Sequence, residues 1–64
     1  MSIRQLFDNE KSDFEEIIKK GCFVTFNTEL NVYMFLYNDK ETNFGGTYNP
    51  RWIMDNVIEI LDIK

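Results

Sequence analysis

Residues 22–37 read CFVTFNTELNVYMFLY, and this stretch decides the fold. Its two halves, Cys22–Asn27 and Val32–Tyr37, are rich in the aromatic and β-branched residues that suit a pleated, packed sheet. The polar residues Thr28–Asn31 between them form a loop of the length that joins antiparallel strands. The stretch therefore predicts a β-hairpin, which is the most apolar part of a very short chain.

Neither face of this hairpin is polar. Side chains alternate along a strand, so one face of the second strand carries Val32, Met34 and Leu36. The other face carries three aromatic residues, which are Tyr33, Phe35 and Tyr37. A sheet that helices cover on one side is expected to be polar on the other side. The aromatic residues therefore either complete the core, with their hydroxyls reaching water, or form a surface for a partner.

The chain has 64 residues and a formal net charge of −4, which limits its architecture and its partners. It is long enough for one domain, residues 1–64, and too short to bury a large core. Cys22 is the only cysteine, so no disulfide within the chain can help, and self-association is the most direct extra source of stability. Seven Lys and Arg against eleven Asp and Glu argue against nucleic-acid binding through phosphates and against a polybasic membrane anchor.

The cysteine content and the hydropathy pattern predict a compartment. A lone cysteine in an apolar run is expected to be a small buried hydrophobe in a reducing environment. The sequence contains no apolar run of the ~20 residues that cross a bilayer, and its start does not resemble a signal peptide. We therefore expect a cytoplasmic protein. The chain has no histidine and no metal-ligand spacing, so we expect no metal and no cofactor. The abundance of Asn, Ile, Phe, Tyr and Lys is typical of an AT-rich genome, which suggests a bacterial or phage source.

The N-terminal third can be interpreted in two ways. Ser2–Gln5 has the spacing of a capping box, and apolar residues follow at the period of a helix. The apolar stripe consists of Ile3, Leu6, Phe7, Phe14, Ile17 and Ile18. We therefore predict one long helix over Ser2–Lys20 that ends at Gly21. The alternative is two shorter helices, because Ser12–Glu15 offers a second capping box and Glu10 would interrupt the stripe of a continuous helix.

The residues after the hairpin complete the predicted fold. Asn38–Glu41 has the composition of a turn, and Thr42–Tyr48 is predicted as a third strand, although Gly45 and Gly46 weaken that prediction. Asn49-Pro50 predicts the start of a C-terminal helix, with Asn as the cap and Pro in the first turn. The predicted class is α+β: an N-terminal helix, a two- to three-stranded antiparallel β-meander and a C-terminal helix (αββ(β)α), with the helices packed on one sheet face.

Two features of the C-terminal helix are candidates for contact with a partner. Trp52 projects off the apolar arc, so it either packs against the loop containing Phe44 and Tyr48 or is exposed, where Trp is often a binding hot spot. An acidic ridge lies nearby and consists of Asp55, Glu59 and Asp62. This ridge is either a solvated face or a surface for a basic partner.

The residue types favour binding over catalysis. Without histidine the usual general base is missing, and the carboxylates are dispersed, so we expect no catalytic residues. We expect a non-enzymatic protein-binding module, such as a small inhibitor or regulator, that buries an aromatic surface with an acidic rim against another protein or a second copy in a homodimer. The predicted contact residues are Tyr33, Phe35, Tyr37, Trp52, Asp55, Glu59 and Asp62. The alternatives are an acidic decoy that blocks a DNA- or RNA-binding groove by imitating nucleic acid, and a structural subunit of a larger assembly.

Overall fold

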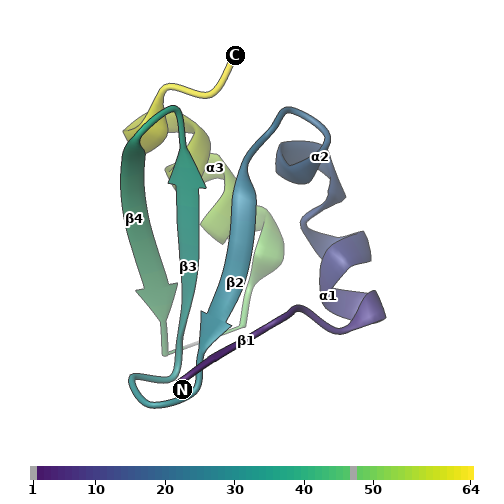
Figure 1. Ribbon diagram of the computed structural model, residues 1–64. Coiled ribbons are helices and arrows are strands. Elements are labelled where there is room, and N and C mark those ends of the chain that lie inside the picture. Colours follow the sequence, from purple (N-terminus) through teal and green to yellow (C-terminus); the bar gives the residue numbers. More distant parts are fainter. Residues whose placement is uncertain (1, 47) are drawn as a thin grey trace.

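The protein folds as a four-stranded antiparallel sheet with helices on one side (Figure 1). The computed structural model describes residues 2–46 and 48–64. The strands, in spatial order, are β1 (Ile3–Arg4), β2 (Phe23–Asn27), β3 (Val32–Tyr37) and β4 (Lys40–Gly45). The helices are α1 (Asp8–Asp13), α2 (Glu15–Ile18) and α3 (Pro50–Leu61). The α+β class is confirmed. Strand β1 was not predicted. Two short helices, α1 and α2, take the place of the single N-terminal helix that the sequence favours.

The predicted hairpin forms, and its register decides which side chains share a face. β2 and β3 pair antiparallel, with Phe26 opposite Tyr33 and Val24 opposite Phe35. Directly opposite residues of neighbouring strands point to the same face of a sheet. The aromatic residues of β3 therefore join Val24 and Phe26 on one face, and this face packs against the helices.

The third strand of the meander is confirmed, but it begins earlier than predicted. Lys40 already lies opposite Tyr37, so only Asn38 and Asp39 form the turn. Both have positive φ angles, 51° and 68°, as a type I′ turn requires. This turn matches the twist of the flanking strands, so pairing starts immediately on either side of it. Thr47, which we included in the predicted strand, lies outside the described residues.

The predicted long helix over Ser2–Lys20 is wrong. The chain begins instead as the edge strand β1, which pairs with the end of β2. The backbone N–H of Thr28 donates to the carbonyl of Ser2 at 2.6 Å, so this segment is extended along the sheet edge. The capping box predicted at Ser2–Gln5 therefore does not form. The alternative with two short helices is the one that the structure has.

Phe14 explains the break between α1 and α2. Its φ of −104° and ψ of 14° are not helical, and α2 begins at the next residue, Glu15. Phe14 is the N-cap of α2 and no described side chain caps this helix, so the second capping box predicted at Ser12–Glu15 does not form. The Phe14 ring is fully buried, and its centroid lies 5.6 Å from that of Phe35. Ile17 in α2 is fully buried as well. The break thus allows both Phe14 and Ile17 to enter the core from very short helices.

The start of α3 and the stop after α2 follow the predicted signals, whereas the stop after α3 was not predicted. The side chain of Asn49 caps α3, because its oxygen accepts from the backbone N–H of Trp52 at 3.3 Å. After α3, Asp62 takes a left-handed conformation with a φ of 54°. Gly21 takes the same conformation after α2, with a φ of 100°, and thus provides the predicted stop.

One apolar core lies between the sheet and all three helices. The buried apolar side chains are those of Leu6, Phe14, Ile17, Cys22, Val24, Phe35, Ile53, Met54, Val57, Leu61 and Ile63. Segments near both ends of the chain contribute side chains to this one core, so the N-terminal helices and α3 cover the same sheet face. Burial raises the pKa of the Cys22 thiol, as expected for a small apolar residue in a core. Of the helices in the described ranges, none has the length and apolar character that crossing a membrane requires.

Candidate functional site

The sheet has a covered face and an open face. The apolar part of the open face is formed by Ile3, Phe23, Val32, Met34 and Leu36. The polar residues Thr25, Asn27, Glu41 and Asn43 lie on the same face. Three of the apolar residues are large and well exposed: Phe23 is 57% exposed, Leu36 44% and Ile3 41%. The helices lie on the other side of the sheet (Figure 1), so they do not shield these residues. The open face thus includes an apolar surface that the described chain leaves in contact with solvent.

A shallow hollow of about 260 Å³ lies in the open face. Its walls include Ile3, Phe23, Met34 and Leu36, and Thr25 lines it while being almost fully buried. Among the residues that the structure describes, Glu41 is the one charged residue that lines it. Pockets for drug-sized ligands usually exceed about 300 Å³ and enclose their ligand. The combination of apolar side chains and a nearly uncharged lining is closer to the core of a protein–protein interface.

The predicted aromatic patch lies on the covered face. Phe35 is only 1% exposed, and Tyr33 and Tyr37 are partly buried against the core. The expectation that Phe35 is available at the surface is therefore wrong. The helices, rather than a partner, cover this face, so a partner could reach Phe35 only by displacing them.

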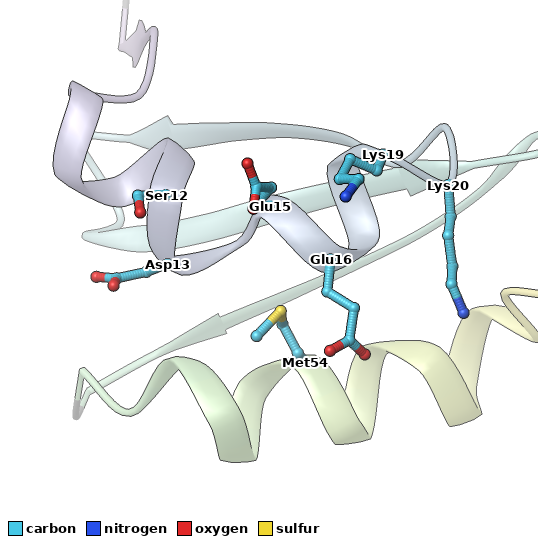
Figure 2. A pocket seen from close by; sticks show the side chains of 7 residues that line it. All are labelled: Ser12, Asp13, Glu15, Glu16, Lys19, Lys20 and Met54. Atoms are coloured by element: carbon cyan, nitrogen blue, oxygen red, sulfur yellow. The ribbon is translucent and has the colours of Figure 1, made fainter.

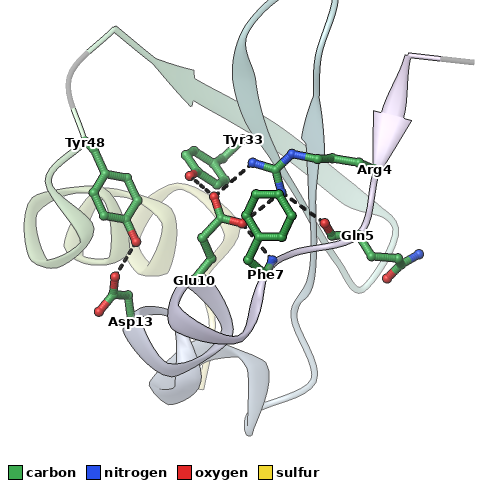
Figure 3. A network of polar contacts seen from close by, with 7 residues as sticks. All are labelled: Arg4, Gln5, Phe7, Glu10, Asp13, Tyr33 and Tyr48. Carbon is green, nitrogen blue, oxygen red and sulfur yellow. Dashed lines mark hydrogen bonds and ion pairs between the residues drawn. The ribbon is translucent and has the colours of Figure 1, made fainter.

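Tyr33 takes part in a polar network around the carboxylate of Glu10 (Figure 3). Arg4 donates to both carboxylate oxygens, at 2.8 Å and 3.1 Å, and the backbone N–H of Phe7 donates at 2.8 Å. The hydroxyl of Tyr33 also donates to Glu10. The guanidinium of Arg4 lies over the rings of Phe7 and Phe26, at 4.1 Å and 4.4 Å from their centroids. The buried carboxylate is thus matched in charge and fully hydrogen-bonded.

The network shifts the pKa values of its two acidic groups away from neutrality. The hydrogen bonds from Arg4 lower the pKa of Glu10 to about 2, and this effect exceeds the opposing effect of burial. Burial and the hydrogen bond to Glu10 raise the pKa of Tyr33 to about 12. Groups that transfer protons in catalysis have pKa values near the working pH. The network is therefore suited to a structural role, in which it ties β1 to α1 and β3.

Trp52 combines the two alternatives that the sequence left open, which are packing near Phe44 and exposure to solvent. Its ring packs edge-on against Phe44, with 5.7 Å between the centroids. It is nevertheless 56% exposed, next to a hollow of about 400 Å³ that it shares with Gly45, Gly46 and Asn49. Trp52 is therefore an exposed side chain with a fixed position, but it belongs to the helix side of the molecule and not to the open face.

The acidic ridge of Asp55, Glu59 and Asp62 lies along the end of α3, and cations neutralise part of it. Arg51 approaches Asp55 at 3.1 Å, and Lys64 approaches Asp62 at 3.5 Å. These exposed pairs contribute little to stability, but they reduce the negative potential that an imitation of nucleic acid needs. The ridge also does not border an exposed aromatic patch on β3, because that patch is covered.

A wider hollow of about 550 Å³ lies between α2 and α3 (Figure 2). It is lined by Ser12, Asp13, Glu15, Glu16, Lys19, Lys20 and Met54. The side chains of Glu16 and Lys20 extend toward α3, and Arg51 of α3 approaches both Glu16 oxygens at 3.4 Å. Flexible side chains of both signs thus neutralise one another along this seam, so it is a weaker candidate than the open face.

The sequence pattern did not indicate Ile3, Phe23 or Leu36 as contact residues. Part of the signal was present, because alternation placed Met34 and Leu36 together on one face. The pattern alone did not show which of two apolar faces the helices would cover. Ile3 was missed for a different reason, since it was assigned to a helix.

Metal-ligand clusters and similarity to known proteins are two other possible signs of function. Within residues 2–46 and 48–64, no three His, Cys, Asp or Glu side chains come together in the way that a metal site requires. Comparisons with known protein families, with characterised proteins and with solved structures give no match. Function must therefore be inferred from the surface of the molecule, and above all from the open face.

Proposed function

We propose that the protein is a non-enzymatic protein-binding module and that the open face is its contact surface. The observation that supports this proposal is the exposure of Phe23, Leu36 and Ile3 around one hollow. Burial of apolar surface contributes about 25 cal/mol per Å². Large contiguous apolar patches on small proteins usually mark contact sites. The open face thus replaces the aromatic surface that the sequence suggested.

The open face suits a flat, apolar protein surface, and a second copy of this chain provides one. Of the described residues, Glu41 is the one charge in the hollow, whereas the whole chain carries a net charge of −4. Two copies that meet through the open face therefore bring few charges into contact. Sheets commonly stack face to face at about 10 Å. An inhibitor or regulator would use the same surface to cover a site on a larger protein.

A cytoplasmic location accords with this function. Cys22 is the only cysteine of the chain, and it is buried as a free thiol. A reducing compartment keeps such a thiol in this state. The partner is accordingly another cytoplasmic protein or a second copy of this chain.

A charge-insertion experiment tests the open face. The double variant Phe23→Lys/Leu36→Lys places two cations there. A matched control, Leu30→Lys/Ile60→Lys, adds the same charge at residues that are 65% and 54% exposed outside the hollow. Sedimentation equilibrium over the micromolar to millimolar range is the measurement. We expect the wild type and the control to associate and the open-face variant to remain monomeric.

Affinity capture from host extract tests for a partner other than a second copy of this chain. If the wild type is monomeric, each tagged protein is used as bait and the captured proteins are compared. A partner that binds the wild type and the control but not the open-face variant supports the proposal. A monomeric wild type whose captured partners are the same for both variants contradicts it.

A further inference from the structure

We propose that a second site, an aromatic hollow at the hairpin end of the sheet, binds a small organic cation such as a quaternary ammonium group. The hollow has a volume of about 210 Å³. It is lined by Phe26, Asn31, Tyr33, Gly45, Gly46 and Tyr48. This volume is below the range of about 300–1,000 Å³ that is usual for drug-sized ligands, so the ligand has the size of a head group. The proposal is independent of the open face.

Three aromatic rings line the hollow at angles to one another. The centroid of Tyr33 lies 4.8 Å from that of Phe26 and 5.7 Å from that of Tyr48. The ring planes are inclined by 65° in the first pair and by 42° in the second, so neither pair forms a parallel stack. Aromatic rings attract cations to their faces, and groups of inclined rings hold quaternary ammonium ligands in many proteins.

The hydroxyl of each tyrosine in the hollow points toward a carboxylate (Figure 3). The hydroxyl of Tyr33 donates to Glu10, and the hydroxyl of Tyr48 donates to Asp13. A hydroxyl that donates to an anion is polarised so that its ring becomes more electron-rich, which strengthens the attraction for a cation. Burial and the hydrogen bond to the carboxylate raise the pKa of each tyrosine, so both remain protonated donors at physiological pH.

The charges around the hollow leave an excess of negative charge. Glu10 is neutralised by Arg4, which itself lies 4.4 Å from the centroid of Phe26. Arg4 thus occupies one face of Phe26, so an entering cation is held mainly by Tyr33 and Tyr48. No ion pair between described residues engages Asp13, and neither Lys nor Arg lines the hollow. A cation entering the hollow thus meets the electron-rich rings with the charge of Asp13 behind them.

Titration with choline and its neutral counterpart separates charge from shape. The full-length protein is titrated with choline chloride and with 3,3-dimethyl-1-butanol, in which carbon replaces the charged nitrogen, while the backbone amide spectrum is recorded. We expect saturable shifts at Tyr33, Gly45, Gly46 and Tyr48 with choline and none with the alcohol at equal concentration. Equal responses to both compounds, or no response to choline, would overturn the proposal.

Matched variants test the two groups that are assigned to the cation. Asp13→Asn removes the carboxylate charge and is compared with Asp8→Asn, which removes an equal charge from an exposed position in the same helix. We expect Asp13→Asn to weaken choline binding about threefold, Tyr48→Leu to weaken it about tenfold and Asp8→Asn to leave it unchanged. Equal weakening by the two Asp variants would show a general charge effect and overturn the site. Tyr48 and Asp13 are both exposed, so these variants are expected to keep the fold.

Two further measurements identify the source of the cation and test whether its site is separate from the open face. A peptide with trimethyllysine, compared with its unmethylated form, distinguishes a protein side chain from a free ligand. Tighter binding of the methylated peptide than of choline assigns the site to a protein side chain, and the reverse assigns it to a free ligand. The variant Phe23→Lys/Leu36→Lys should bind choline as the wild type does. A loss of choline binding in that correctly folded variant would contradict a separate site.

Discussion

The covered and open faces of the sheet are both apolar, but only one of them forms the core. Phe35 is 1% exposed beneath the helices, whereas the next residue, Leu36, is 44% exposed on the open face. Apolar content therefore does not decide which face of a small sheet is buried. The polar groups of the two faces differ, since the hydroxyl of Tyr33 meets the buried carboxylate of Glu10 under the helices. The aromatic face can thus be buried without leaving a hydroxyl unsatisfied, which would be costly.

Truncation of adjacent residues in β3 should show the largest difference between the faces. Phe35→Ala removes a fully buried ring and should lower the free energy of unfolding by about 3–5 kcal/mol, a large share of the stability of a small domain. Leu36→Ala removes a half-exposed side chain and should cost less than about 1 kcal/mol. Urea denaturation measures both. Equal losses of unfolding free energy for the two variants would contradict the difference in burial between the two faces.

Removal of the buried carboxylate should have the next largest effect. Glu10→Gln keeps the shape of the side chain but leaves Arg4 without its counter-charge, and it should cost about 2–3 kcal/mol. Glu16→Gln is the matched control, because Glu16 pairs with Arg51 at the surface at 3.4 Å, and it should cost less than about 0.5 kcal/mol. The free energy of unfolding in urea is compared at neutral pH. If Glu10→Gln costs no more than Glu16→Gln, the network does not anchor the covered face.

The acid limb of the stability curve should show a smaller effect of the same network. The pKa of Glu10 is lowered from 4.5 to about 2 in the folded protein. Its contribution is therefore complete above pH 4.5 and is lost as the pH falls toward 2, because the unfolded chain takes up the proton first. We expect the wild type to lose about 1–2 kcal/mol more than Glu10→Gln between pH 7 and pH 3. Parallel curves for the two proteins would contradict the lowered pKa.

The parts of the fold that local signals specify could be predicted from the sequence. The polar loop Thr28–Asn31 marked the hairpin, the Asn49 cap marked the start of α3, and Gly21 marked the end of the N-terminal helical region. Each of these depends on the conformational preference of a few neighbouring residues. Such signals were sufficient for the meander, for α3 and for the α+β class.

The N-terminal segment could not be predicted, because its structure depends on distant partners. Ile3 fits a helical stripe, but it pairs with Asn27 in the sheet. Glu10 interrupts that stripe, and the reason lies in its contact with Tyr33, 23 residues later. The same contact lies on the face that the helices cover. The contact residues predicted on β3 and those of the open face differ by one position along the strand, which is enough to exchange the two faces.

The most direct test of the open face is the solvent exposure of its methyl groups before and after association. A paramagnetic co-solute weakens the NMR signals of exposed methyl groups, so Ile3 and Leu36 report on the open face and Ile60 on α3. We predict that all three signals are weakened in the dilute monomer and that Ile3 and Leu36, but not Ile60, become protected when the protein associates with itself or with a captured partner. Protection of Ile60 while Ile3 and Leu36 remain weakened would show that the contact surface lies elsewhere.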